Sequence, residues 1–151
     1  MNSTIVRQAV LSDLDELVPL FDSYRQFYGR ESDVVGAREF LLSRYNHGES
    51  VLFIAQKGEE TVGFVQLYPS FSSVSLARTF ILNDLFVSPW ARRGGVAKNL
   101  ISAAIEFAGS LGAIRMTLST AVTNAAAQAL YKSSGWQRDE QYYVYHFSVP
   151  A

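Results

Sequence analysis

The sequence predicts a mixed α/β domain built around one central sheet of about six or seven strands with about four helices. Two observations support this fold class. Strand-like and helix-like segments alternate along the 151 residues without a linker, repeat or low-complexity run. The composition, with 48% hydrophobic and 18% charged residues, is that of a globular chain. A chain of this length predicts a single domain spanning residues 1–151.

The first half of the chain predicts strands where apolar residues alternate or run together, and helices where they recur every three or four residues. Ser32 or Asp33 is suited to cap the second helix. In chain order we expect a strand at 4–9, helices at 14–28 and from 33 to about 46, strands at 51–56 and 61–68, and a loop at 69–73.

The second half continues the alternation. The run Phe80–Val87 is mostly apolar, as is typical of a central strand covered on both faces. After it we expect a helix at 96–111, a strand at 114–118, a helix at 124–134 and two final strands at 136–138 and 142–149.

Composition excludes several classes of protein. The 13 basic and 14 acidic residues nearly cancel, so nothing indicates a nucleic-acid partner. The chain has no cysteine and only two histidines, so disulfides and thiol nucleophiles are excluded and no metal site is expected. Neither a signal peptide nor a membrane span is visible, and we therefore expect a cytoplasmic protein.

The most informative segment runs from Leu82 to Ala97, where an apolar strand enters a basic, glycine-rich turn that opens a helix. The first N–H groups of a helix lack intrahelical partners, and the helix dipole adds positive charge there. Arg92, Arg93 and Lys98 add basic charge, and no acid lies between Ser88 and Asn99. The pattern predicts a phosphate or pyrophosphate site, although a solvated surface turn is the simpler alternative.

Two motifs in this order resemble the GNAT acetyltransferase superfamily. Residues 92–97, Arg-Arg-Gly-Gly-Val-Ala, match its (Gln/Arg)-x-x-Gly-x-(Gly/Ala) loop. Residues 124–136 resemble its second motif, in which an Asn opens a helix and a Tyr precedes a Gly–aromatic pair. The resemblance covers nearly the whole chain. It implies the GNAT fold, whose central sheet is twisted and mostly antiparallel, and an acetyl-CoA-dependent N-acetyltransferase.

The resemblance also implies which residues bind acetyl-CoA. Backbone amides of the loop would hold the pyrophosphate, backbone groups at the end of the preceding strand would pair with the pantetheine arm, and Asn124 would contact that arm. The residues expected to bind the cofactor are Leu85, Phe86, Val87, Arg92, Arg93, Gly94, Gly95, Val96, Ala97, Lys98, Asn124 and Tyr131.

Tyr131 and Asp84 are the candidate catalytic residues. By the resemblance, the Tyr131 hydroxyl would point at the thioester sulfur and protonate the departing thiolate. The segment around Asp84 is similar to Leu-Glu-Asp-Phe-Phe-Val of spermidine-type polyamine acetyltransferases, with Asn83 in place of the glutamate. Because Asn cannot act as a base, the proton would be removed either through Asp84 and water or through water alone. The alternative role of Asp84 is structural. Asn83 and Asp84, adjacent on a strand, are expected to point to opposite faces.

The acceptor would lie beside the first two helices, where aromatic residues gather. Tyr24, Phe27 and Tyr28 have helical spacing, which fits either a core stripe or an aromatic wall for an amine. With Asn83 and Asp84 they form the predicted acceptor site. The expected acceptor is a small primary amine, polyamine or amino acid.

Three further expectations concern the acceptor, catalysis and the oligomeric state. A protein lysine or N-terminal amine is the alternative acceptor. A non-catalytic acyl-CoA binding module is the alternative to an enzyme. The long aromatic segment at 142–149 would be a hazard as an exposed edge strand, so we expect it to form part of a homodimer interface.

Overall fold

The computed structural model describes residues 3–151, which divide into two compact units. The N-terminal unit ends at Ser119, and the C-terminal unit is Thr120–Ala151. The expectation that residues 1–151 form a single domain stays a prediction.

A five-stranded sheet forms the centre of the N-terminal unit. Its strands are β1 (Thr4–Gln8), β2 (Val51–Lys57), β3 (Glu60–Ser72), β4 (Ala77–Val87) and β5 (Arg115–Thr117), and they lie in that order across the sheet. The first three pairings are antiparallel, and only β4 and β5 run parallel. The mixed α/β class and the mostly antiparallel sheet are thus confirmed.

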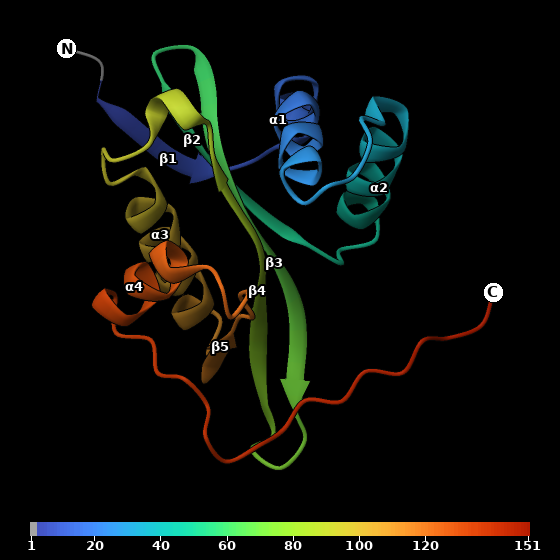
Figure 1. Ribbon diagram of the computed structural model, residues 1–151, viewed down its shortest axis with the longest axis vertical. Coiled ribbons are helices and arrows are strands. Elements are labelled where there is room, and N and C mark those ends of the chain that lie inside the picture. Colours follow the sequence, from blue (N-terminus) through green and yellow to red (C-terminus); the bar gives the residue numbers. More distant parts are fainter. Residues whose placement is uncertain (1–2) are drawn as a thin grey trace. The chain divides into compact units, whose positions relative to one another are not determined.

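Helices cover both faces of this sheet. Figure 1 shows α1 (Leu14–Phe27) and α2 (Val34–Asn46) on one face and α3 (Val96–Ser110) on the other. Two short 3-10 turns, η1 (Leu11–Asp13) and η2 (Pro89–Ala91), precede α1 and α3. Of the two candidate caps for α2, Asp33 is the one the structure uses, because its carboxylate accepts a hydrogen bond from Gly36 N at 2.9 Å.

The apolar core under α1 and α2 fixes the face on which the candidate site lies. Phe64 of β3 is fully buried, and its ring lies 5.9 Å from Phe21 and 5.6 Å from Tyr24, both of α1. Phe86 of β4 joins the same cluster, with its ring 5.8 Å from Tyr24. Burying such large apolar side chains drives folding and holds α1 against β3 and β4.

β3 is longer than the sequence predicts. The expected loop at 69–73 is mostly strand, since β3 continues to Ser72 and Pro69 lies opposite Phe80. Beyond Leu67, which pairs with Val51 at the start of β2, β3 has a neighbour on one side only among residues 3–151. A proline, which cannot donate to a ladder, is tolerated on such an edge.

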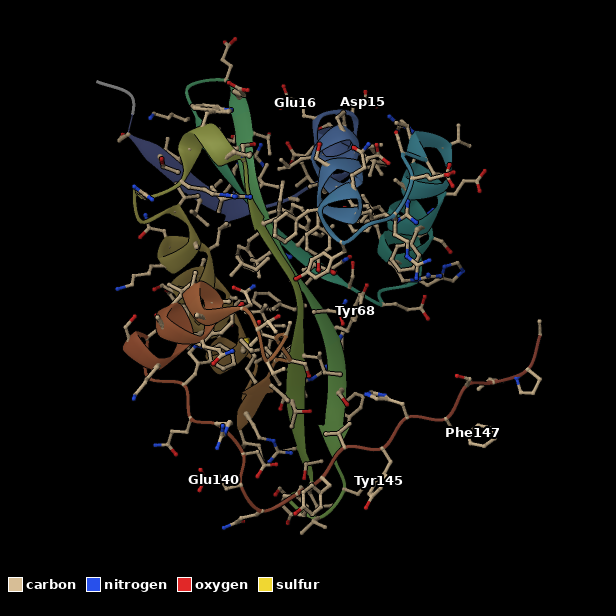
Figure 2. All side chains as sticks on the ribbon, in the orientation of Figure 1. Asp15, Glu16, Tyr68, Glu140, Tyr145 and Phe147 are labelled. Atoms are coloured by element: carbon tan, nitrogen blue, oxygen red, sulfur yellow. The ribbon has the colours of Figure 1, made fainter. Side chains whose placement is uncertain are left out.

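The two final strands expected at 136–138 and 142–149 do not form in the described chain, and this accounts for the smaller strand count. The C-terminal unit contains one helix, α4 (Ala125–Ser133), followed by a segment without helix or strand. Tyr145 and Phe147, labelled in Figure 2, are 89% and 87% exposed. A strand exists only through hydrogen bonds to a neighbour, and aromatic, β-favouring residues do not supply that neighbour themselves.

None of the helices in residues 3–151 combines the length and the apolar character that crossing a lipid bilayer requires.

Candidate functional site

The loop between β4 and α3 has an unusual backbone. After η2, Arg93 adopts a φ of +69° and Gly95 a φ of +78°. Glycine enters this left-handed region without cost, whereas other residues do so rarely. Gly94 and Gly95 are exposed, and a Cβ built on Gly95 would meet no atom within 4 Å. The backbone is therefore open to close approach by a ligand.

The N-terminus of α3 opens at this loop. The first helical hydrogen bond runs from Asn99 N to Gly95 O at 3.0 Å, and no side chain caps the helix. By helix geometry, the N–H groups of residues 95–98 have no intrahelical acceptor. The first turn contains no acidic residue. Because the dipole places partial positive charge here, this end is suited to bind an anion.

Arg92 is held back from the loop. Its Nε donates to the Val87 carbonyl at 2.9 Å, and its guanidinium lies 5.5 Å from the centre of the Phe86 ring and 5.9 Å from that of Phe27. These contacts join the loop to the end of β4 and to the end of α1. Because these contacts hold the Arg92 side chain, the backbone amides that follow Arg92 are the better candidates for direct contact with an anion.

The end of β4 presents a free backbone edge beside this loop. β5 pairs with β4 only from Thr79 to Ile81, so within the described chain no strand covers that side of β4 from residue 82 to 87. Ser88 N donates to Val62 O of β3 at 2.8 Å. Since N–H and C=O groups alternate in direction along an antiparallel pair, Leu85 and Val87 direct theirs away from β3, toward the free side.

A buried carboxylate lies on the α1 and α2 face of the same strands. Asp84 is only 6% exposed, and its Oδ2 accepts a hydrogen bond from Gln66 Nε2 of β3 at 2.7 Å. Its Oδ1 accepts from Asn83 Nδ2 at 3.1 Å. Both donors are neutral amides, which satisfy the carboxylate without cancelling its charge.

A β-bulge explains why Asn83 and Asp84 do not point to opposite faces. Gln66 pairs with Asp84 and Leu67 pairs with Leu82, so Asn83 is an extra residue on β4. A bulge breaks the alternation of side chains, and here it brings the Asn83 amide to its neighbour's carboxylate. The expectation of opposite faces was wrong because it assumed a regular strand.

The pKa values of two tyrosines near this carboxylate are raised. Burial, followed by the charge of Asp84 and a hydrogen bond to it, raises the pKa of Tyr24 far above its ordinary value. Burial and the charge of Asp84 raise the pKa of Tyr68 from 10.0 to about 12, against a smaller opposing effect of Arg44. Figure 2 shows Tyr68 on β3 near the edge of the helical layer. Both tyrosines are therefore neutral phenols at physiological pH.

The predicted aromatic acceptor residues separate into two groups. Tyr24 is half-buried and packs on Phe64 and Phe86, so it belongs partly to the core. Phe27 and Tyr28 are each 61% exposed, with their rings 5.3 Å apart. The core-stripe interpretation thus holds for Tyr24, whereas Phe27 and Tyr28 remain available on the surface.

Sequence reasoning missed Gln66 as a site residue. It is fully buried and holds Asp84, and its Nε2 also lies 3.3 Å from the Tyr68 hydroxyl. The available signal was a lone amide inside the apolar run of residues 62–67. A polar group in such a run needs a partner or a function.

The C-terminal unit contains Asn124 and Tyr131. Asn124 caps α4, because its Oδ1 accepts from Ala127 N at 3.1 Å. Its side-chain amide nitrogen is not used by this cap. Tyr131 lies on the last turn of α4, with its ring 5.9 Å from that of Trp136. The Tyr131 carbonyl accepts from Trp136 N at 3.0 Å, which fixes the turn through Gly135.

The sequence matches the model of the acetyltransferase (GNAT) family over residues 16–136. The chain belongs to the GNAT family. The chain is therefore an acyl-CoA-dependent acetyltransferase, and the alternative of a non-catalytic binding module is set aside. The narrower resemblance to spermidine-type enzymes stays a prediction.

Full-length relatives agree with the family assignment. An uncharacterized N-acetyltransferase of Bacillus subtilis, YhfO, is 47% identical over 97% of this chain and 98% of its own. A probable acetyltransferase of Haemophilus influenzae is 32% identical over 91% and 92%. The crystal structure of a probable acetyltransferase superimposes with a TM-score of 0.92 at 44% identity, covering 97% of this chain and 99% of that one.

A more distant GNAT structure shares the fold alone. The aminoglycoside N-acetyltransferase AAC(6')-Iy, solved in complex with CoA, superimposes with a TM-score of 0.80 at 21% identity. The superposition covers 99% of this chain and 97% of that one. The GNAT backbone thus persists where four residues in five differ.

Replacing Gly95 by alanine tests the open loop. A Cβ at a φ of +78° strains the backbone by about 1 kcal/mol, although it meets no neighbouring atom. We expect the loop to shift and the affinity for CoA, measured by calorimetry, to fall by about tenfold, the equivalent of about 1.4 kcal/mol.

Gly109→Ala is the matched control, because Gly109 lies within α3 at an ordinary φ and its Cβ also meets no atom. Alanine should stabilise the helix there by about 1 kcal/mol and leave CoA binding unchanged. Equal CoA affinities for the two variants would contradict an anion site at this loop.

Alkaline unfolding tests the environment of Tyr68. The folded state favours the neutral phenol, since the pKa of Tyr68 is about 12 when folded and close to 10.0 when unfolded. This contribution to stability is complete below pH 10 and is lost as the pH rises to 12. In urea unfolding at several pH values, Tyr68→Phe should lose less stability over this interval than the wild type. Tyr145→Phe, at an exposed tyrosine, should behave as the wild type, and equal slopes for all three proteins would refute the assignment.

Proposed function

We propose that this enzyme transfers the acetyl group of acetyl-CoA to a primary amine, with a small amine, polyamine or amino acid as the acceptor. The observation that supports the proposal most strongly is the open N-terminus of α3 next to the free edge of β4. One feature suits a pyrophosphate, and the other suits an extended amide-containing arm. Acetyl-CoA contains both groups and supplies the activated acetyl thioester.

The residues present fit this cosubstrate. The backbone amides of residues 95–98 are free of helical acceptors, and the glycines leave space above them. Leu85 and the N–H of Val87 are available for the pantetheine arm, whereas the Val87 carbonyl already accepts from Arg92. The Val87 N–H also suits the developing oxyanion, since preorganised donors stabilise such charge. We keep the amide nitrogen of Asn124 as a further contact to the arm.

Acetyl transfer requires a neutral amine. A lysine-like amine has a pKa of about 10.4, so only about one molecule in a thousand is neutral near pH 7.4. Asp84, buried and held by two amides, is the proposed acceptor of the ammonium proton, directly or through water. Asn83 lacks basic character and serves as a donor to Asp84. Tyr24, Phe27 and Tyr28 form the proposed aromatic wall of the acceptor site.

The proton and electron balance assigns one further role. The neutral amine nitrogen forms the C–N bond as the C–S bond breaks, and the sulfur leaves with the electron pair. The nitrogen loses its second proton in this step, to water or to Asp84 once Asp84 has passed the first proton to solvent. Tyr131 is the proposed general acid that gives this thiolate its proton. Its phenolate is then reprotonated from solvent.

Tyr131→Phe tests this role with a panel of acceptors. Thiol release from acetyl-CoA is measured with polyamines, lysine, other amino acids, aminoglycosides and a basic peptide. We expect one class of small amine to drive release, and loss of the Tyr131 hydroxyl to slow it at least tenfold. Tyr142→Phe, at an exposed tyrosine of the same unit, should retain the wild-type rate. Release driven by the peptide alone would favour a protein acceptor, and an unchanged rate in Tyr131→Phe would remove its role.

We also propose a homodimer in which the aromatic segment 142–149 contributes to the interface. The support is its exposure: Tyr143 and Tyr145 are 91% and 89% exposed, and such a patch marks an interaction surface. Sedimentation should give twice the chain mass of 16.8 kDa, and truncation after Gln141 should give the monomer. A monomeric full-length chain would contradict the proposal. The cytoplasmic location stays a prediction.

A further inference from the structure

Gln66 is a fully buried amide in a strand that is otherwise apolar at this point. It lies directly opposite Asp84, with Val65 and Leu67 on either side completely buried. An apolar residue of similar volume would suit the packing and leave no polar atom to satisfy. A buried amide at this position therefore needs a reason other than packing.

The orientation of the Gln66 amide is determined by its neighbour. Nε2 donates to Asp84 Oδ2 at 2.7 Å and lies 3.3 Å from the Tyr68 hydroxyl. Exchanging the positions of Nε2 and Oε1 would press a carbonyl oxygen against the carboxylate, so only one orientation is compatible with an ionised Asp84. In that orientation Oε1 is buried without a hydrogen-bond partner among the described residues. The Gln66 amide group thus donates to Asp84 while its own carbonyl oxygen is left without a donor.

The charge of Asp84 is not balanced by a basic side chain of the N-terminal unit. The ion pairs of the described chain join Arg7, Arg38, Arg44 and Arg138 to other acids. Arg44, the basic residue whose charge reaches Tyr68, is paired with Glu49 at 2.9 Å. A buried carboxylate is normally paired with a cation. Asp84 is instead held by the amides of Gln66 and Asn83 and by the phenol of Tyr24, which leaves the cation to come from outside.

We propose that Gln66 is a positioning residue of the acceptor site, which holds the Asp84 carboxylate in place to receive a cationic primary ammonium. The inference rests on the proposed acetyl transfer and deepens it, because it assigns the recognition of the acceptor's charge to Asp84 and its orientation to Gln66. Gln66 acts through Asp84 and does not itself contact the reacting atoms.

The groups around Asp84 come from each element packed on this face. Tyr24 of α1 and Tyr68 of β3 face the carboxylate, Tyr28 of α1 lies behind Tyr24, and Arg44 of α2 acts on Tyr68. Both tyrosines stay neutral throughout the range in which an acetyltransferase is assayed. Differences between variants in that range therefore report on Asp84 and the amide that holds it.

The test compares pH profiles of kcat/KM for the amine in the wild type, Gln66→Met and Gln66→Glu. The ionisation of the acceptor itself is the same for all proteins and cancels in the comparison. Methionine fits the space but cannot donate, so it removes one of the two amide hydrogen bonds to the Asp84 carboxylate, which favour the ionised form. Glutamate places a second carboxyl beside Asp84, so that the pair shares a proton. Both substitutions should move the acid limb upward by about one pH unit, while KM for acetyl-CoA stays within twofold.

Thr79→Val is the matched control. Thr79 is also a buried polar residue of the sheet, five residues from Asp84 on the same strand, and valine keeps its shape. Its profile should follow the wild type. If Gln66 merely filled space, Gln66→Met would leave the acid limb unchanged, and that result would overturn the proposal.

A second measurement does not depend on activity. Thermal unfolding of Gln66→Met, Asp84→Asn and the double variant forms a double-mutant cycle without any substrate. The effect of Gln66→Met should fall by about half once Asp84 is neutral, because hydrogen bonds to a charged group are about twice as strong. Additive effects would overturn the proposal.

The two measurements separate the possible failures. If the wild type acetylates none of the amines although it binds acetyl-CoA, the proposed function fails and the positioning role fails with it. A non-additive cycle in that case would identify the Gln66–Asp84 bond as structural only. An active enzyme with an unmoved acid limb would instead leave the proposed function intact and refute the inference alone.

Discussion

The partial pairing of β4 is the constraint on which the candidate site depends. In the part of the chain that the structure describes, β4 has β3 along one side for its whole length but β5 on the other for only three residues. Within the described chain, the backbone groups of Leu85 and the N–H of Val87 therefore have no strand partner, immediately before a loop that opens a helix N-terminus, whereas the Val87 carbonyl accepts from Arg92. Unsatisfied backbone groups are costly when buried, so this edge is stable only in contact with water or a ligand.

Two local departures from regular structure complete the site. The bulge at Asn83 brings two neighbouring side chains together, and the left-handed residues Arg93 and Gly95 turn the chain into α3. Arg92 links these features, since it bonds to the Val87 carbonyl and lies over Phe27 and Phe86. Arg92 thus contacts both the acceptor side and the end of the strand before the loop. A substitution on either side is therefore expected to affect the other.

Periodicity predicted the four helices and the first five strands, because apolar spacing reports directly which face is buried. Periodicity failed where hydrogen bonding to a neighbouring strand decides whether a segment forms a strand. Pro69 was expected in a loop because prolines disrupt interior strands, yet it lies on a stretch of β3 with one free side. The segment 142–149 has strand-like composition but no neighbour in the described chain. Gln66 and the bulge were missed for the same reason: both depend on pairing between strands, which a single segment does not encode.

The most direct test of the account is a titration of the isotope-labelled protein with CoA, followed by amide chemical shifts. The account predicts that the backbone amides of residues 93–98 and of Leu85 and Val87 shift most, because they contact the pyrophosphate and the pantetheine arm. Desulfo-CoA should produce the same shifts at the loop, since it retains the pyrophosphate. The absence of binding, or shifts confined to residues outside the loop and the end of β4, would contradict the assignment of this site.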